Sequence, residues 1–314
     1  FGDIMPMAMP SQPYRGVYPI APTPFNEDES LDLDGQRRVL DCMIDQNVDG
    51  ICILANYSEQ FLLTDAERDQ LLVTCMEHVA GRVPVIATCS HFSTQVSVAR
   101  ARQAEAVGAD MIMMMPPYHG TGLKASEAGN FSYFQSLAAA ISIPIMVQDA
   151  PLSGVNLSVA FLAGLARQMP QIGYFKIEVP GAAGKLRDLI AAGGAAIQGP
   201  FDGEESITLM ADLDAGATGT MPSALLPELI RPVLMDYLAG NTEQAAESYA
   251  RILPLLNFEN RQCGLRATKT AMMEGGVIKS DIVRHPLEPL HPETRQQLLA
   301  QAEALDVLAL RWGR

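Results

Sequence analysis

The sequence predicts an α/β fold, a closed (β/α)8 TIM barrel with a C-terminal helical extension. Short apolar runs alternate with helical patterns eight times, the runs are continuous rather than alternating, and no strand pattern follows residue 240. Continuous apolar runs are typical of parallel strands that helices cover on both faces. Eight such repeats in 314 residues favour a closed barrel over an open sheet.

Each expected strand is a short apolar run, and a segment with helical spacing follows it. The expected strands are residues 16–25, 48–55, 84–90, 111–115, 144–150, 172–179, 195–199 and 217–222. The expected helices are residues 33–46, 64–80, 93–109, 126–141, 158–169, 182–194, 202–216 and 223–240. Thr64 and Glu67 have the spacing of a capping box at the start of the second helix. The methionines of residues 111–115 are expected to fill the core.

Three regions follow from this pattern. Residues 1–13 are rich in Pro and Met and are expected to be a disordered tail. Residues 14–240 form the predicted catalytic barrel. Residues 241–314 carry two further helical patterns, at 242–256 and 292–310, and are expected to pack on the barrel as a helical appendix.

Composition excludes several classes of function. The formal net charge of −14 and the pI of about 4.7 argue against a nucleic-acid partner, which requires clustered Lys and Arg. No apolar stretch has the length of a membrane span and the start lacks a secretory signal pattern, so we expect a cytoplasmic protein with no membrane partner. The five cysteines are widely spaced, and no metal-ligand spacing joins the five histidines. We therefore expect reduced cysteines, no metal and no cofactor.

The expected sixth strand carries the candidate chemistry. Its period of two places Tyr174, Lys176 and Glu178 on one face and the apolar Phe175 and Ile177 on the other. The apolar face should meet the helices, so Lys176 and Glu178 should project into the barrel. Burial disfavours an ammonium ion and favours the neutral amine, which is a nucleophile for ketones. The alternative is a structural ion pair that fills the mouth of the barrel.

Six segments occur in the order of a known family's motifs. They read GVYPIAPTPF, ILANYSEQFLLTDAER, PPYHG, PIMVQDAP, YFKIE and GATGTMPSALLPE. In this order the chain resembles the dihydrodipicolinate synthase / N-acetylneuraminate lyase family, whose members form a Schiff base with a 2-keto acid. The resemblance spans residues 16 to about 230 and implies that Lys176 is the Schiff-base lysine. It also implies a homo-tetramer.

The loop after the second strand is where this family binds the substrate carboxylate. Asn56, Tyr57 and Ser58 stand at the place of the family's G-T-T-G-E loop and retain hydrogen-bonding groups. The resemblance therefore implies that they bind the carboxylate of a 2-keto acid. For Asn56 alone, an ordinary polar turn explains the residue equally well.

The expected fifth strand departs from the family. Gln148 and Asp149 occupy the positions of the family's Tyr-Asn, so the phenol that relays protons is missing. An amide cannot act as a base, so Gln148 is a candidate for substrate binding only. The arginine that recognises a second substrate in the synthases would fall near Ser153, so that condensation is also disfavoured.

Other polar residues are weaker candidates for substrate binding. Tyr118 and His119 follow the fourth strand, where the family often has a second tyrosine, and a turn histidine is an equal alternative. Asp202, Glu204 and Glu205 follow the expected seventh strand and could contact a sugar chain. Acids at the start of a helix are also common as caps.

These departures favour a branch of the family that dehydrates 2-keto-3-deoxy sugar acids. The implied substrate is L-2-keto-3-deoxyarabonate, the implied product is 2,5-dioxopentanoate, and Glu178 is the candidate general acid and base. Three alternatives remain. They are an aldolase that releases pyruvate, a dehydratase of a six-carbon sugar acid, and a sugar-acid-binding protein without catalysis.

Overall fold

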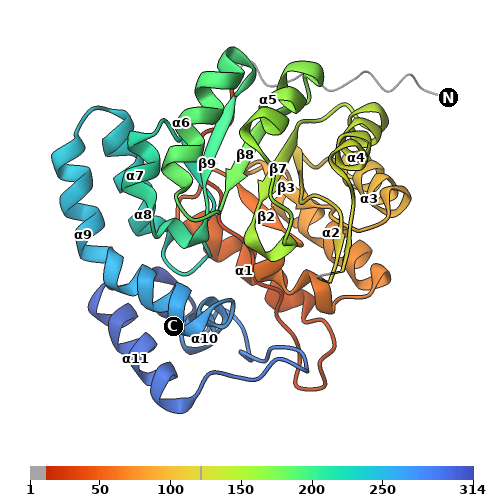
Figure 1. The fold of residues 1–314 in the computed structure, drawn as a ribbon. Coiled ribbons are helices and arrows are strands. Elements are labelled where there is room, and N and C mark those ends of the chain that lie inside the picture. Colours follow the sequence, from red (N-terminus) through yellow and green to blue (C-terminus); the bar gives the residue numbers. More distant parts are fainter. Residues whose placement is uncertain (1–11, 121) are drawn as a thin grey trace. The chain divides into compact units, whose positions relative to one another are not determined.

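The computed structural model describes residues 12–120 and 122–314, in which strands alternate with helices (Figure 1). These residues form two compact units. Unit 1 comprises the described residues up to Arg15, then Ile86–Asp202 and Ala211–Gly219, and unit 2 comprises Gly16–Val85, Gly203–Met210 and Thr220–Arg314. Most of the expected tail, residues 1–11, lies outside the described residues. Among the described helices, none is long and apolar enough to span a membrane.

Five strands, which lie in unit 1 apart from Val85, pair in parallel in the order β3, β4, β7, β8, β9. They are β3 (Val85–Thr88), β4 (Met111–Met114), β7 (Ile145–Asp149), β8 (Ile172–Ile177) and β9 (Gly199–Asp202). All residues of these strands are buried. The methionines of β4 lie in the core, as the sequence predicts.

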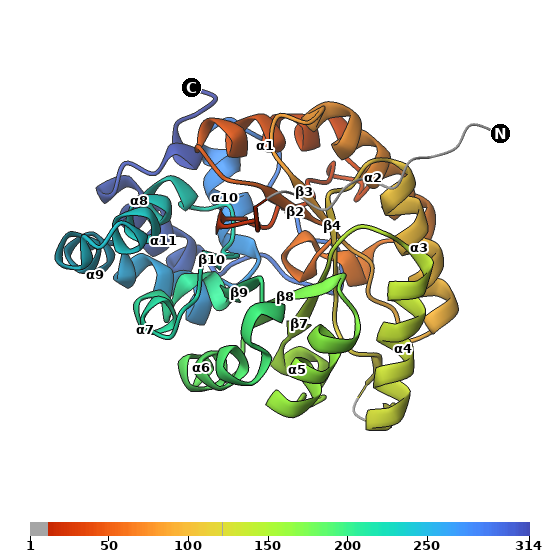
Figure 2. The same ribbon diagram turned by 90° about the horizontal axis from the view of Figure 1, so that it is seen from above.

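Three helices of unit 1 begin after a capping serine: α3 (Thr94–Ala106), α4 (Glu127–Ala140) and α5 (Val159–Gln168). A fourth, α6 (Ala182–Gly193), begins after Gly181 and has no side-chain cap. The hydroxyls of Ser93, Ser126 and Ser158 accept hydrogen bonds from the first turns of α3, α4 and α5. Helices α5 and α6 pack against β8 (Figure 2). Their buried leucines, such as Leu162 and Leu189, supply the apolar surface that meets the sheet.

Unit 2 contains the first strands of the chain and the C-terminal helices. Its elements include β1 (Gly16–Val17), β2 (Ile51–Ile53), α1 (Leu33–Asp45), α2 (Asp65–Val79), α8 (Pro227–Leu238), α9 (Thr242–Phe258), α10 (Arg266–Glu274) and α11 (Pro292–Ala304). Parallel bridges join Ile20 to Cys52 and to Ser223. The capping box of Thr64 and Glu67 is confirmed. All five cysteines are free and buried, as expected.

The position predicted for the seventh strand, residues 195–199, is wrong. A 3-10 turn occupies Gly194–Ala196, and the strand β9 begins at Gly199. Gly199 allows close approach of β8, because an added Cβ would lie 2.2 Å from the ring of Tyr174. The alanine-rich run is apolar enough to resemble a strand, but it ends a helix. Asp202 is therefore the last residue of a strand rather than the first of a helix.

Two further segments differ from the sequence prediction. The segment expected to be a simple turn after β4 forms a two-stranded antiparallel hairpin of β5 (Tyr118–His119) and β6 (Leu123–Lys124). Helix α10 was not expected, because its sequence RATKTAMME is mostly polar. The helix forms because its buried face includes the apolar side chains of Ala267, Ala271 and Met272.

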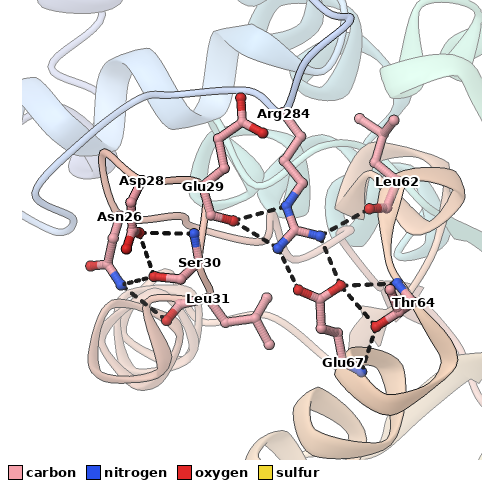
Figure 3. Close-up of polar contacts among 9 residues, drawn as sticks. All are labelled: Asn26, Asp28, Glu29, Ser30, Leu31, Leu62, Thr64, Glu67 and Arg284. Atoms are coloured by element: carbon pink, nitrogen blue, oxygen red, sulfur yellow. Dashed lines mark hydrogen bonds and ion pairs between the residues drawn. The ribbon is translucent and has the colours of Figure 1, made fainter.

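Arg284 joins three segments of unit 2 (Figure 3). Its guanidinium group binds both carboxylate oxygens of Glu67, at 2.8 and 2.5 Å, and the backbone oxygens of Leu62 and Glu29. Glu67 also accepts the hydrogen bond from Thr64 N that closes the capping box of α2. The hydrogen bonds from Arg284 lower the pKa of Glu67 to about 2.

Glu67→Gln should destabilise the protein in a pH-dependent way. The pKa of Glu67 is lower in the folded chain than its ordinary value of 4.5, so its contribution is present above that value and is lost as the pH falls toward 2. We expect the free energy of unfolding at pH 7 to fall by about 1–2 kcal/mol. Urea denaturation at pH 7 and pH 4 should show a smaller difference from the wild type at the lower pH. The exposed Glu77→Gln on α2 is the control, and an equal difference at both pH values would contradict the prediction.

Candidate active site

Lys176 and Glu178 form a close pair at the end of β8. The Lys176 side chain is buried, and its Nζ lies 2.8 Å from Oε1 of Glu178. Glu178 lies two residues after Lys176. Because side chains alternate between the faces of a strand, both side chains lie on one face. A carboxylate oxygen at this distance can take a proton from the amine or return one.

Gln148 holds the second oxygen of Glu178. In the register of β7 and β8, Gln148 lies opposite Lys176, and its Nε2 donates to Glu178 Oε2 at 2.8 Å. Gln148 is itself buried. Both carboxylate oxygens of Glu178 are therefore engaged, one by the lysine and one by the amide, which fixes the orientation of the carboxyl group.

A second charged pair lies beside the first, and the sequence does not predict it. Lys185, in the first turn of α6, places its Nζ 2.5 Å from Asp149 Oδ2 and donates to the backbone oxygen of Leu157. Burial raises the pKa of Asp149, and Lys185 partly offsets that effect. The backbone oxygen of Asp149 also accepts a hydrogen bond from Glu178 N at 3.0 Å. The helical pattern does not distinguish Lys185 from other lysines, because lysine is common on the exposed surface of a helix.

Asp202 lies at the same end of the sheet. It is fully buried and stands opposite Ile177 in the register of β8 and β9. The expected caps, Glu204 and Glu205, belong to unit 2 and open no α-helix there. They lie in a 3-10 turn with left-handed backbone, and Glu205 accepts a hydrogen bond from Asn260.

Tyr118 and His119 lie on the hairpin of β5 and β6. Tyr118 is half-buried and His119 is exposed, with its ring 6.0 Å from that of Phe92. Burial raises the pKa of Tyr118, so its phenol stays protonated near neutral pH. Tyr118 can act as a hydrogen-bond donor.

The turn of Asn56, Tyr57 and Ser58 belongs to unit 2 and follows β2. Asn56 and Tyr57 are partly exposed, whereas Ser58 is buried. The Ser58 hydroxyl donates to Ala21 O at 2.6 Å and accepts from Ala55 N at 3.1 Å. These internal bonds make Ser58 the residue that shapes the turn. Within residues 12–120 and 122–314, no cluster of three or more potential ligands is placed to hold a metal ion.

Comparisons with known proteins agree on one family. A sequence model of the Dihydrodipicolinate synthetase family matches residues 13–305. The chain is 55% identical to L-2-keto-3-deoxyarabonate dehydratase from Azospirillum brasilense over 96% of this chain and 97% of that protein. It is 31% identical to 4-hydroxy-tetrahydrodipicolinate synthase 2 from Streptomyces coelicolor over 93% of this chain and 96% of the relative.

A solved structure extends this similarity to the fold. The 4-hydroxy-tetrahydrodipicolinate synthase from Methylacidiphilum fumariolicum SolV aligns with a TM-score of 0.85 at 25% identity, over 92% of this chain and 96% of that one. Such neighbours are TIM barrels, which confirms the predicted (β/α)8 class with additional C-terminal helices.

Lys185→Met should destabilise the chain by isolating a buried charge. It leaves Asp149 without its counter-ion, and breaking such a pair typically removes about 3 kcal/mol from the free energy of unfolding. Adding Asp149→Asn should restore most of the loss, because the amide needs no counter-charge. Urea denaturation of both variants measures the effect. The control is Arg187→Met on the same helix, which breaks an exposed pair with Asp214 and should cost less than about 1 kcal/mol.

Proposed function

The chain belongs to the dihydrodipicolinate synthetase family, and we propose that it is an L-2-keto-3-deoxyarabonate dehydratase. It would convert L-2-keto-3-deoxyarabonate into 2,5-dioxopentanoate and water. The supporting relative carries this name and is similar over nearly the whole length of both proteins. The observation that carries the proposal is the buried Lys176 with Glu178 at 2.8 Å and Gln148 behind it.

Lys176 would act as the nucleophile. Its neutral amine attacks the C2 carbonyl of the substrate, water leaves, and an iminium ion forms. The positive nitrogen acidifies the protons on C3. Glu178 lies close enough to the lysine to accept a proton released in this step, so it also prepares the amine for attack.

Glu178 would then carry a proton from C3 to the leaving hydroxyl. Its carboxylate removes one C3 proton and leaves an enamine. The enamine expels the C4 hydroxyl, to which protonated Glu178 returns the proton, and water departs. Loss of a C5 proton and tautomerisation create the aldehyde, and hydrolysis of the imine frees Lys176. Imine formation releases one water and imine hydrolysis uses one, so these two steps cancel. The water lost from C4 is the net product.

Gln148 favours dehydration over carbon–carbon cleavage. Aldol cleavage requires a base for the C4 hydroxyl, and an amide cannot serve as one. In this chain the amide donates to Glu178 instead, which keeps the carboxylate directed at the lysine. Gln148 therefore disfavours the aldolase reaction and supports the dehydratase reaction.

The remaining candidates would bind the substrate. We propose that the partly exposed Asn56 and Tyr57 bind the carboxylate of the keto acid, and that Ser58 maintains their turn. Tyr118, His119 and Asp202 would contact the hydroxylated end. We also propose that this small acid is the ligand and that the protein works as a homo-tetramer. Light scattering measures the mass of the assembly.

Incubation with synthetic L-2-keto-3-deoxyarabonate tests the function. Mass spectrometry should detect a product lighter than the substrate by one water, and trapping with an aldehyde reagent should label its new carbonyl. Pyruvate and glycolaldehyde as the main products would instead identify an aldolase. A six-carbon 2-keto-3-deoxy acid, assayed in parallel, should react more slowly.

Variants at the two inward residues separate their roles. Borohydride reduction with pyruvate should attach the ligand to Lys176, and Lys176→Met should abolish both this label and turnover. Glu178→Gln preserves the volume of the side chain but removes the base, so labelling should persist while kcat falls about 10²–10⁴-fold. Turnover near the wild-type rate would make Glu178 a structural partner.

A matched substitution controls for the loss of one negative charge. Glu127 is exposed in the first turn of α4, so Glu127→Gln should leave both labelling and turnover unchanged. If Glu178→Gln loses labelling altogether, Glu178 sets the protonation state of the lysine, and the lost turnover then follows from the failure to form the imine.

A further inference from the structure

Glu59 ends the turn that we propose binds the substrate carboxylate. It follows Ser58 directly, and its backbone N–H donates to Asn56 O at 3.0 Å. Its side chain is fully buried, and both oxygens are bound. Oε2 lies 2.6 Å from Lys269 Nζ, and Oε1 accepts from the backbone N–H of Arg284 at 3.1 Å.

The backbone at both ends of this turn is left-handed. Leu54 has a φ of 58° and Glu59 has a φ of 57°. Residues other than glycine rarely adopt this conformation, and it persists only where the surrounding structure holds it. The turn therefore needs an external restraint, and the side chain of Glu59 supplies a point of attachment.

The restraint comes from the C-terminal part of the chain. Lys269 on α10 is fully buried, donates to Ile282 O, and lies 4.4 Å above the ring of Phe25. Arg284 lies at the same distance from that ring. Its side chain binds the backbone oxygen of Leu62 (Figure 3), so the chain just after the turn is held as well.

We infer that Glu59 is a positioning residue for substrate recognition, and that Lys269 and Arg284 make the C-terminal helical segment part of the carboxylate-binding machinery. This inference rests on the proposed function. A buried ion pair is a weak source of stability, because desolvation opposes the attraction between the charges. An ion pair does fix the positions of its two groups, and here it fixes Glu59, the residue that ends the binding turn.

The expected consequence concerns affinity rather than chemistry. Without the pair, Asn56 and Tyr57 would no longer be held in one arrangement before the ligand arrives, and the ligand would have to order them. The amine of Lys176 and the carboxylate of Glu178 are unchanged by this loss. KM should therefore rise while kcat stays near the wild-type value.

The test is the double variant Glu59→Gln/Lys269→Met, which removes both charges and leaves neither one buried alone. The initial rate of borohydride labelling is measured against pyruvate concentration, together with KM and kcat for the sugar acid. The matched control is Asp49→Asn/Arg231→Met, which removes another ion pair of unit 2. Asp49 lies before β2, whereas the proposed binding turn follows β2. Thermal unfolding monitors the fold of each variant. If the first variant does not fold, Glu59→Gln/Lys269→Gln replaces it.

A rise of about tenfold or more in half-saturating pyruvate, with normal labelling at saturation and with the control unchanged, supports the inference. An unchanged half-saturation overturns it, as does an equal rise in the control or a loss of labelling at saturating pyruvate. Absence of labelling in the wild type would contradict the proposed function itself, so the two failures are distinguishable.

Discussion

Charged side chains that leave water need a counter-charge within a few ångströms, and this requirement organises the polar interior of the protein. Lys176 pairs with Glu178, Asp149 pairs with Lys185, and Glu59 pairs with Lys269. The second and third pairs join segments that are distant in the sequence, whereas the first joins two residues at the end of one strand. In the pair of Lys176 and Glu178, the carboxylate can also exchange protons with the amine.

The parallel register of unit 1 determines which side chains meet. Gln148 lies opposite Lys176 across one pair of strands, and Asp202 lies opposite Ile177 across the next. Polar groups at the carboxyl ends of adjacent parallel strands therefore gather at one end of the sheet, while the apolar residues of the same strands pack on helices. The site is a consequence of strand order and of the alternation of side chains along each strand.

Substitutions relative to the family occur together in this site. Where the family has Tyr-Asn, this chain has Gln148 and Asp149. The glutamine amide reaches Glu178, and the aspartate has the counter-charge of Lys185, which a neutral asparagine would not need. In this chain, the two positions therefore carry a hydrogen bond to the Glu178 carboxylate and an ion pair with Lys185. These changes fit a site in which one carboxylate moves the protons.

The sequence was enough to predict the barrel class, the position of Lys176 and Glu178 on one face, and the capping box of Thr64 and Glu67, because these depend on local periodicity and on short motifs. It did not locate the seventh strand, since an alanine-rich run is apolar in a helix end as well as in a strand. Nor did it give roles to Lys185, Lys269 or Arg284, whose partners lie far away in the sequence. These contacts became visible in the folded chain, because the partner of a buried charge is the group that packing brings beside it and not a neighbour along the chain.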